Sequence, residues 1–211
     1  MSKKDLVLIG SGGMAREVRW VIDTCNMTDD RWNILGWVSK EKPGTMIDGL
    51  PVLGDDDWLL AHDEPVDVVV SVGDGALRKK IAGNLRKNAN ISFPVIIAPS
   101  AELSDSVELG EGSVIMNQSI LTVGIRTGAF FLCNYGCTIG HDLRADGYVS
   151  VFPGAHISGN VCLEEGATIG VGASVIQGIT IGRNAMIGAG AVVISDIPAD
   201  STAVGVPAKV R

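Results

Sequence analysis

The hydrophobic residues between Leu103 and Val193 recur every six positions. Of the sixteen positions in this series, thirteen hold Leu, Ile or Val. The position four residues further on is mostly small, as at Ser113 and Ala155. A period of six fits neither a helix nor an alternating strand, and it is typical of a parallel β-helix, in which three hexapeptides close one triangular coil. We expect the aliphatic and small residues to point inwards, and glycines that follow the aliphatic residue, such as Gly140, to allow the corner conformations.

Three positions interrupt the aliphatic series, and they fall close together. They hold Thr127, Cys133 and Ala145. Local departures from a folding pattern are expected at functional sites. The interruption therefore indicates a coil that is locally altered or functional.

The first ninety-seven residues show a different pattern, in which apolar strands alternate with helical segments. Strands are expected at 5–10, 34–38, 66–72 and 91–97, and helices at 15–25, near 55–61 and at 77–85, with a Gly/Pro/Asp-rich loop after the second strand. The third strand, VDVVVSV, is almost continuously apolar, as expected when both faces of a sheet are covered. This alternation predicts a small parallel α/β sheet of Rossmann type. We expect two domains, an α/β domain at 1–98 and an all-β parallel β-helix with a C-terminal tail at 99–211.

The charge and the cysteines narrow the class of protein. The net charge of −7 over 211 residues argues against nucleic acid or an anionic membrane surface as a partner. No apolar run approaches the ~18 residues that span a bilayer, and the start of the chain does not resemble a signal peptide. The four cysteines show no metal-ligand spacing. We interpret them as reduced, mostly buried thiols of a cytoplasmic protein.

A glycine-rich loop follows the first expected strand. Residues 10–15 match G-x-G-x-x-A between a strand and a helix, where backbone amides and the helix N-terminus cradle phosphates. A dinucleotide site needs an acidic residue at the end of the second strand, but Ser39 and Lys40 stand there. This disfavours NAD and favours a nucleotide or its diphosphate. The alternative is a tight glycine turn without a ligand.

A second candidate loop, at Gly73, follows the third expected strand. The carboxyl ends of parallel strands line the crevice in which α/β folds bind ligands. An ordinary turn before a helix is an equally good interpretation of this loop.

One of the three histidines stands in an unusual place. His141 occupies a corner of the expected β-helix, next to Asp142 and just after the interrupted positions. Imidazole exchanges protons near neutral pH, which suits a general base, and the adjacent carboxylate can orient the ring. An exposed turn residue is the alternative. We expect surface positions for His62 and His156. A zinc site of carbonic anhydrase type needs three histidines, but the repeat holds only two, so we expect no metal.

Several segments of the chain resemble the left-handed β-helix acyltransferases. More narrowly, the chain resembles the sialic acid O-acetyltransferase and nucleotide-aminosugar N-acetyltransferase family, whose members include bacterial enzymes of surface-glycan synthesis that N-acetylate UDP-4-amino-4,6-dideoxy sugars and GDP-perosamine. The segments that carry this resemblance are CNYGCTIGHD (133–142), VFPGAHISGNV (151–161), IGAGAVV (187–193), VGVPAKVR (204–211) and GDGALRKKIA (73–82).

This resemblance implies a homotrimer of left-handed rods, although parallel crossovers are usually right-handed. It implies that acetyl-CoA lies between rods and that the N-terminal domain holds the nucleotide-linked sugar. It also implies that His141 is the general base, that Asp142 tunes it, and that a backbone amide matching Gly159 stabilises the oxyanion. The remaining implied contacts are Asn134 to the acceptor sugar, Ser150, Gly159, Val171 and Ala189 to the coenzyme, and Gly12, Gly13 and Met14 to the nucleotide.

The chain also departs from the family pattern. Members often carry His at the positions of Met14 and Ser150, and an acidic pair where this chain has Ser39 and Lys40. The lost acidic pair puts UDP in doubt and leaves a guanine nucleotide open. The expected function is N-acetylation of a UDP- or GDP-linked 4-amino-4,6-dideoxy sugar. The alternatives are a sugar O-acetyltransferase of the sialic acid type and a non-enzymatic scaffold.

Overall fold

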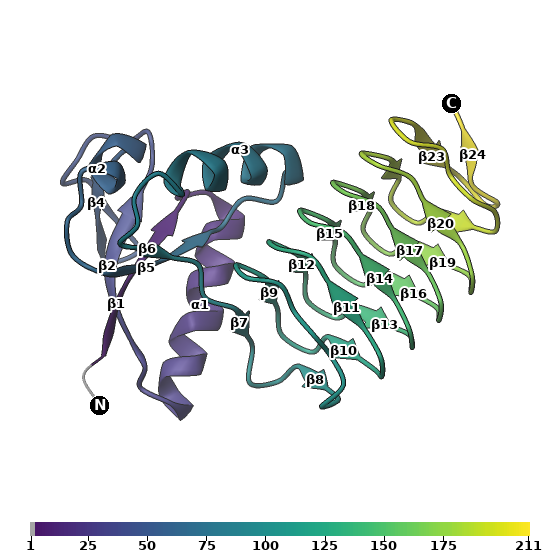
Figure 1. Cartoon of the computed structure of the whole chain (residues 1–211), viewed down its shortest axis with the longest axis horizontal. Helices are drawn as coiled ribbons and strands as arrows, with labels where there is room; N and C mark the ends of the chain where they lie inside the picture. The colour runs from purple at the N-terminus through teal and green to yellow at the C-terminus, as the bar shows by residue number, and fades with distance from the viewer. Residues whose placement is uncertain (1–2) are drawn as a thin grey trace. The chain divides into compact units, whose positions relative to one another are not determined.

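The computed structural model describes residues 3–211, and the chain divides after Pro99 into an α/β unit and a solenoid (Figure 1). No helix in this described range is both long and apolar enough to cross a membrane. All four cysteines are free thiols; two are buried and two are half-buried.

The α/β unit is built on one six-stranded sheet with the order β3-β4-β2-β1-β5-β6. Apart from the β3–β4 pair, the strands run parallel. Every residue of β5 is buried, as its apolar pattern predicts. The elements of this unit are β1 (Lys4–Ile9), α1 (Gly13–Thr28), β2 (Trp32–Val38), β3 (Met46–Ile47), β4 (Leu50–Gly54), α2 (Asp56–Leu60), β5 (Val66–Val70), α3 (Gly75–Leu85), β6 (Ile91–Ser92) and β7 (Ile96–Ile97).

The segment interpreted as a loop after the second strand contains a β-hairpin. Strands β3 and β4 pair antiparallel through the two residues Asp48 and Gly49. Both residues have positive φ, 47° and 80°, which is the conformation of the tight hairpin turns that favour Asp-Gly. The prediction missed this hairpin because the Asp-Gly pair lies within a run of loop-forming residues.

The expected strand at 91–97 is interrupted in the structure. It forms the short strands β6 and β7, with Phe93, Pro94 and Val95 between them. Proline has no N–H to donate to a neighbouring strand, so a continuous strand cannot pass through Pro94.

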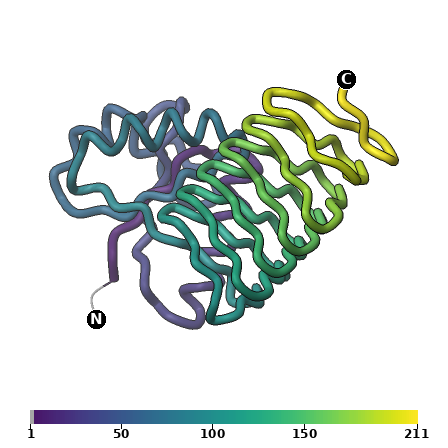
Figure 2. The backbone as a smooth tube through the Cα atoms, turned by 45° about the vertical axis from the view of Figure 1, so that its right-hand side comes forward, coloured from purple at the N-terminus to yellow at the C-terminus, as the bar shows by residue number. Residues whose placement is uncertain are grey.

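The solenoid consists of short strands that stack in register, and Figure 2 shows its coils following one another along the solenoid. Residues eighteen apart pair in parallel, as Ile139 does with Ile157, so three hexapeptides make one coil as predicted. The three faces have the strand orders β22-β19-β16-β13-β10-β8, β11-β14-β17-β20 and β24-β23-β21-β18-β15-β12-β9. At Leu109 an isolated bridge from Glu108 to Arg126 replaces the strand.

Each strand of the repeat ends on the residue of the six-residue series. The strands are β8 (Glu102–Leu103), β9 (Val114–Ile115), β10 (Ile120–Leu121), β11 (Arg126–Thr127), β12 (Leu132–Cys133), β13 (Thr138–Ile139), β14 (Arg144–Ala145), β15 (Ser150–Val151), β16 (His156–Ile157), β17 (Cys162–Leu163), β18 (Thr168–Ile169), β19 (Ser174–Val175), β20 (Thr180–Ile181), β21 (Met186–Ile187) and β22 (Val192–Val193). They are followed by β23 (Thr202–Val204) and β24 (Lys209–Val210).

The solenoid core confirms the predicted inward positions. The aliphatic residues Ile139 and Ile169 and the small residues Ser113 and Ala155 are all 0% exposed. The buried apolar residues at these positions form one hydrophobic cluster along the coils. A close-packed core is rigid, which lets the corners hold side chains in fixed positions.

The glycines that follow the aliphatic residue have a different role from the one we predicted. A Cβ atom at Gly140 or Gly170 would lie 2.7 Å or 2.5 Å from backbone atoms of the next coil, and neither glycine has positive φ. Their function is to permit close stacking of coils. The left-handed corners fall two residues later, at positions such as Asp142 and Gly154, with φ of 58° and 65°.

Packing accounts for part of the interruption in the aliphatic series. Phe131 occupies the inward position that holds Ser or Ala in several other hexapeptides, and it is 0% exposed. The less bulky Thr127 and Cys133 flank it in the series. A large side chain in one inward position leaves less volume for its neighbours, since protein interiors are close-packed. The interruption therefore has a packing cause.

Candidate active site

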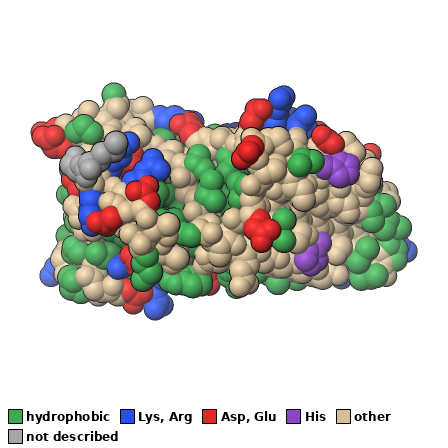
Figure 3. All heavy atoms as spheres, turned by 90° about the horizontal axis from the view of Figure 1, so that it is seen from below, with side chains coloured by type: hydrophobic (Ala, Val, Ile, Leu, Met, Phe, Trp, Pro, Cys, Tyr) green, Lys and Arg blue, Asp and Glu red, His purple; other side chains and the backbone are tan. Residues whose placement is uncertain are grey.

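His141 and Asp142 form a hydrogen-bonded pair at the corner that follows β13. The distance from His141 Nδ1 to Asp142 Oδ2 is 2.9 Å, and the two side chains are 47% and 54% exposed. A carboxylate only accepts hydrogen bonds, so Nδ1 carries the proton and donates it. In the neutral ring Nε2 is then an acceptor, which is the state that a general base requires. Figure 3 shows histidine side chains at the surface of the solenoid, where a substrate can reach them.

The His141 ring lies against the backbone of Gly159 in the next coil. A Cβ atom at Gly159 would lie 2.3 Å from His141 Nε2, so only glycine leaves room for the ring. The carbonyl of His141 accepts a hydrogen bond of 2.8 Å from the amide of Asn160. Within residues 3–211, the N–H of Gly159 donates to no acceptor. The corner therefore places a free imidazole nitrogen next to a free backbone donor.

Asn134 lies in the preceding hexapeptide and is 3% exposed. Its Oδ1 accepts a hydrogen bond of 2.8 Å from the amide of Tyr135, and its carbonyl accepts one of 2.8 Å from Ser119 Oγ. No hydrogen bond in the described chain joins Asn134 to His141. The contact of Asn134 with the acceptor sugar stays a prediction.

The residues expected to touch the coenzyme differ in accessibility. Val171 and Ala189 are exposed and occupy the same corner in successive coils, where the amide of Gly190 donates to the carbonyl of Val171 at 2.8 Å. Ser150 is fully buried in the single chain. Its side chain is therefore closed to a coenzyme in this structure, and the expected contacts with the coenzyme stay predictions.

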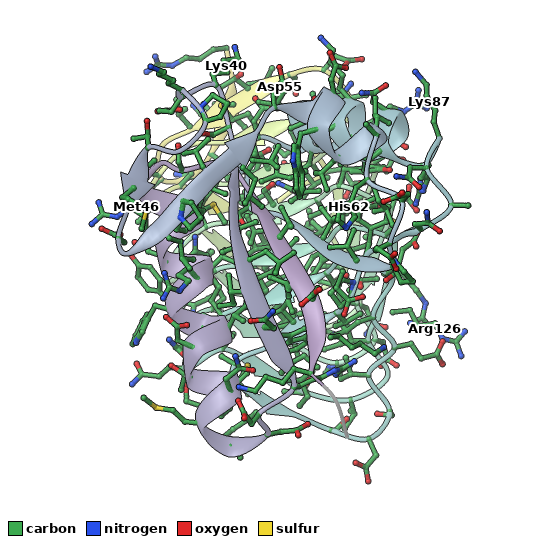
Figure 4. All side chains as sticks on the ribbon, turned by 90° about the vertical axis from the view of Figure 1, so that its left-hand side faces the viewer. Lys40, Met46, Asp55, His62, Lys87 and Arg126 are labelled. Carbon is green, nitrogen blue, oxygen red and sulfur yellow. The ribbon has the colours of Figure 1, made fainter. Side chains whose placement is uncertain are left out.

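The α/β unit contains a cavity of about 1110 Å³ at the carboxyl ends of β1, β2 and β5. This is the edge at which parallel α/β sheets bind ligands. In Figure 4, Lys40, Asp55 and Lys87 lie around this end of the sheet. The lining comprises Ile9, Gly10, Ser11, Val38, Ser39, Lys40, Glu41, Asp55, Asp56, Asp57, Val72, Leu77, Lys80, Ile81, Gly83, Asn84 and Lys87.

The cavity includes some of the predicted substrate contacts and not others. Ser39 and Lys40 line it, whereas Gly12, Gly13, Met14 and Gly73 do not. Besides Lys40, the charged side chains of the lining are those of Glu41, Asp55, Asp56, Asp57, Lys80 and Lys87, and the sequence analysis did not predict them. The run of three aspartates was the available signal, but it was interpreted only as the start of a helix.

Contacts within the fold hold the Gly73 loop. The buried Arg78 donates from Nη1 to the carbonyls of Val72 and Gly73, at 2.8 and 3.0 Å. Asp74 caps α3 by accepting a hydrogen bond of 2.8 Å from the amide of Leu77. These contacts hold the loop and fix the edge of the cavity at Val72. The expected contact of Gly73 with the substrate stays a prediction.

The other two histidines make local contacts. His62 stacks on Trp58 with 5.0 Å between ring centroids, and His156 Nδ1 lies 2.8 Å from Thr138 Oγ1. No group of three His, Cys, Asp or Glu side chains in the described part of the chain is arranged to hold a metal ion.

Comparison with known proteins identifies relatives of both units. The family model described as the PglD N-terminal domain matches residues 5–85. The chain is similar to a GDP-perosamine N-acetyltransferase from Escherichia coli O157:H7, with 29% identity over 139 residues. That match covers 66% of this chain and 62% of the relative, which is less than two thirds of the relative's length.

Two solved structures resemble the chain over its whole length. The acetyltransferase domain of PglB from Neisseria gonorrhoeae is 32% identical, with a TM-score of 0.92 over 99% of this chain and 100% of that one. The H141N mutant of perosamine N-acetyltransferase from Caulobacter crescentus, in complex with CoA and GDP-perosamine, is 33% identical, with a TM-score of 0.91 over 100% and 98%. Both matches extend over the α/β unit and the solenoid, in sequence as well as in fold. The chain belongs to the left-handed β-helix acetyltransferases.

Proposed function

We propose that this chain transfers an acetyl group from acetyl-CoA to the amino group of a nucleotide-linked 4-amino-4,6-dideoxy sugar. The observation that carries the proposal is the corner at His141, where a free Nε2 adjoins the free N–H of Gly159. A base and an oxyanion donor side by side are the groups that acyl transfer to an amine requires. The Caulobacter crescentus relative, solved with CoA and GDP-perosamine, supports this assignment.

The reaction follows from these two groups. The neutral sugar amine attacks the thioester carbonyl and forms the C–N bond, while His141 Nε2 takes the proton that the nitrogen loses. The N–H of Gly159 stabilises the negative charge on the carbonyl oxygen. Collapse of the intermediate breaks the C–S bond, and the imidazolium returns the proton to the departing thiolate of CoA. Asp142 keeps the ring oriented through its hydrogen bond with Nδ1.

The α/β unit supplies the nucleotide site in this proposal. Its cavity is large enough for a nucleoside diphosphate, and Lys40, Lys80 and Lys87 line it. A Cβ atom at Gly12 or Gly13 would contact nothing within 4 Å, and neither residue has positive φ, so the fold itself does not require glycine there. Gly10 and Ser11 of the same loop line the cavity, and in this proposal the phosphate approaches the backbone of this loop closely.

A homotrimer with acetyl-CoA between rods is the proposed assembly. Solenoid corners expose the aliphatic side chains of Val171, Ile176 and Ile194, which are 52%, 43% and 52% exposed. Contact between copies would cover such side chains, and light scattering coupled to gel filtration tests the trimer. A cytoplasmic location is proposed because acetyl-CoA is the acyl donor.

The decisive experiment replaces His141 with alanine and measures acetylation of the amino sugar. Loss of a general base is expected to lower kcat about 10²- to 10⁴-fold, while His156→Ala, the matched control, keeps its rate. Near-normal turnover of His141→Ala would show that the amine attacks unaided.

Two alternative functions predict different results. A sugar O-acetyltransferase of the sialic acid type would acetylate a hydroxyl and would depend on the base more strongly, because a hydroxyl must lose its proton to attack well. A non-enzymatic scaffold would bind no acetyl-CoA, which calorimetry with CoA tests directly.

A further inference from the structure

The coil before the candidate active site leaves room for the carboxylate of Asp142. Gly124 stands eighteen residues before Asp142 and occupies the same corner one coil earlier. A Cβ atom at Gly124 would lie 2.7 Å from Asp142 Oδ1. The other oxygen of this carboxylate, Oδ2, lies 2.9 Å from His141 Nδ1. The group that orients the histidine ring therefore occupies the space that a side chain at position 124 would fill.

The backbone does not by itself require a glycine at this corner. Gly124 has a φ of 68°, in the left-handed region that glycine adopts most easily. The next two coils adopt the same conformation at this corner with Asp142 and Asn160, whose φ angles are 58° and 54°. Asp and Asn tolerate this conformation better than other residues with a side chain. The corner could therefore hold another residue at position 124, but the carboxylate of Asp142 could not then stay where it is.

Hydrogen bonds hold Gly124 on both sides of its Cα atom. Its N–H donates to Ser106 Oγ at 2.9 Å, and its carbonyl accepts from Arg144 Nη1 at 2.7 Å. The preceding carbonyl, of Val123, accepts from the amide of Asp142 at 2.9 Å. The side chain of Asp142, in contrast, is 54% exposed and has room to turn towards solvent. A side chain added at position 124 would therefore displace the carboxylate and not the backbone.

We propose that Gly124 is a positioning residue for acetyl transfer, because the space it leaves fixes the carboxylate that orients His141. This inference rests on the proposed function and adds a residue that acts through Asp142. Ordinary contacts begin at 3.4 Å, so a Cβ atom at position 124 would move Oδ1 by about 0.7 Å. A shift of that size is enough to take the bond from Nδ1 to about 3.6 Å, at which it is lost. The ring is then free to turn and to carry its proton on Nε2, the nitrogen that must accept the proton of the amine.

Gly124→Ala tests the inference against a matched control, Gly166→Ala. Gly166 is also a left-handed corner glycine, with a φ of 72°, and a Cβ atom there would lie 2.6 Å from Asn184 Oδ1. The two substitutions therefore impose the same backbone strain and the same kind of contact with a side-chain oxygen. The difference is that the Asn184 side chain donates to Asp200 and holds no histidine.

The assay measures acetylation of the amino sugar and thermal unfolding on the same samples. We expect Gly124→Ala to lower kcat about 10- to 100-fold. The KM for each substrate should stay unchanged, because neither substrate loses a contact. Gly166→Ala should keep the wild-type kcat, although both variants should lose the same amount of thermal stability.

Two further measurements separate a positioning role from a structural one. Gly124→Ala in an Asp142→Ala background should cost no more than Asp142→Ala alone, because the carboxylate that the new side chain displaces is gone. Nitrogen NMR of the neutral His141 ring, assigned by comparison with His141→Ala, reports which nitrogen carries the proton. The proton should stay on Nδ1 in wild-type protein and in Gly166→Ala, and it should be shared between Nδ1 and Nε2 in Gly124→Ala.

The inference is wrong if Gly124→Ala and Gly166→Ala have equal turnover, or if the losses from Gly124→Ala and Asp142→Ala add in full. It is also wrong if the His141 ring carries its proton on the same nitrogen in both variants and in wild-type protein. Each of these results leaves the proposed function standing as long as His141→Ala is inactive. Wild-type protein that acetylates no nucleotide-linked amino sugar would overturn the proposed function and this positioning role together.

Discussion

Replacing Gly159 with alanine should disable the base although His141 itself is unchanged. The new Cβ atom would lie 2.3, 2.4 and 2.7 Å from three ring atoms of His141, including Nε2. Ordinary contacts begin at about 3.5 Å, so the ring must move by about 1 Å. Gly159 has no positive φ, so the alanine backbone is unstrained and the steric effect falls on the ring alone.

The expected loss of activity is large, and the expected loss of stability is small. A displacement of 1 Å at a catalytic group can cost about 10²-fold in rate, which corresponds to about 2.7 kcal/mol of activation free energy. The His141 side chain is 47% exposed, so it can swing towards solvent without opening the core. We expect the free energy of unfolding to change by no more than about 0.5 kcal/mol.

The assay follows release of CoA at saturating acetyl-CoA, with thermal unfolding measured on the same samples. The control is Gly147→Ala, at the same place in its hexapeptide, where the nearest atom to a Cβ is the carbonyl oxygen of Ala129 at 3.3 Å. Combining Gly159→Ala with His141→Ala should cost nothing beyond the histidine change, because both act on one ring. A normal rate for Gly159→Ala, or fully additive losses, would refute this account.

Three further predictions address the solenoid. Ile169→Ala removes a fully buried side chain and should lower the free energy of unfolding by about 2–5 kcal/mol in urea denaturation. Gly170→Ala should lower the free energy of unfolding by about 1–3 kcal/mol, because the new side chain would press on the backbone of the next coil. Gly154→Asn, at an open left-handed corner, should change that free energy by about 0.5 kcal/mol or less. Equal effects of the two changes would contradict the two roles of glycine. Burial raises the pKa of the Cys162 thiol, and the carboxylates of Asp146 and Glu164 raise it further. Glu164→Gln should therefore lower that pKa, increase the thiolate fraction and speed alkylation of Cys162 at pH 8. An unchanged alkylation rate would contradict this prediction.

The solenoid was predictable because its constraint is local and repeated. Each hexapeptide states which residue points inwards, and the structure places Ile139 and Ala155 inside as predicted. The role of Gly140 was not predictable in the same way. Its constraint is the backbone of a residue nineteen positions away, Gly159, and a residue pattern does not show such distances.

The site was predictable only where its residues are neighbours in sequence. His141 and Asp142 adjoin each other, and their hydrogen bond needs no knowledge of the tertiary structure. The nucleotide cavity is different, because its lining comes from the ends of three strands and from α2 and α3. Asp56 and Lys80 meet there only because the sheet order places those segments together, and the polar pattern of each segment alone indicates a solvated surface.

The eighteen-residue coil restricts how the gene for this protein can change in length. A duplication or deletion of eighteen codons inside the solenoid leaves every later side chain on its own face, because residues such as Ser150 and Thr168 are already equivalent. An insertion of six codons would also keep the inward residues inward, but it would turn all that follows by one face. Placed between His141 and Gly159, such an insertion would preserve the hydrophobic pattern and yet separate the base from its glycine. Inherited changes in rod length that retain activity should therefore come in whole coils, or as loops that leave the solenoid at a corner.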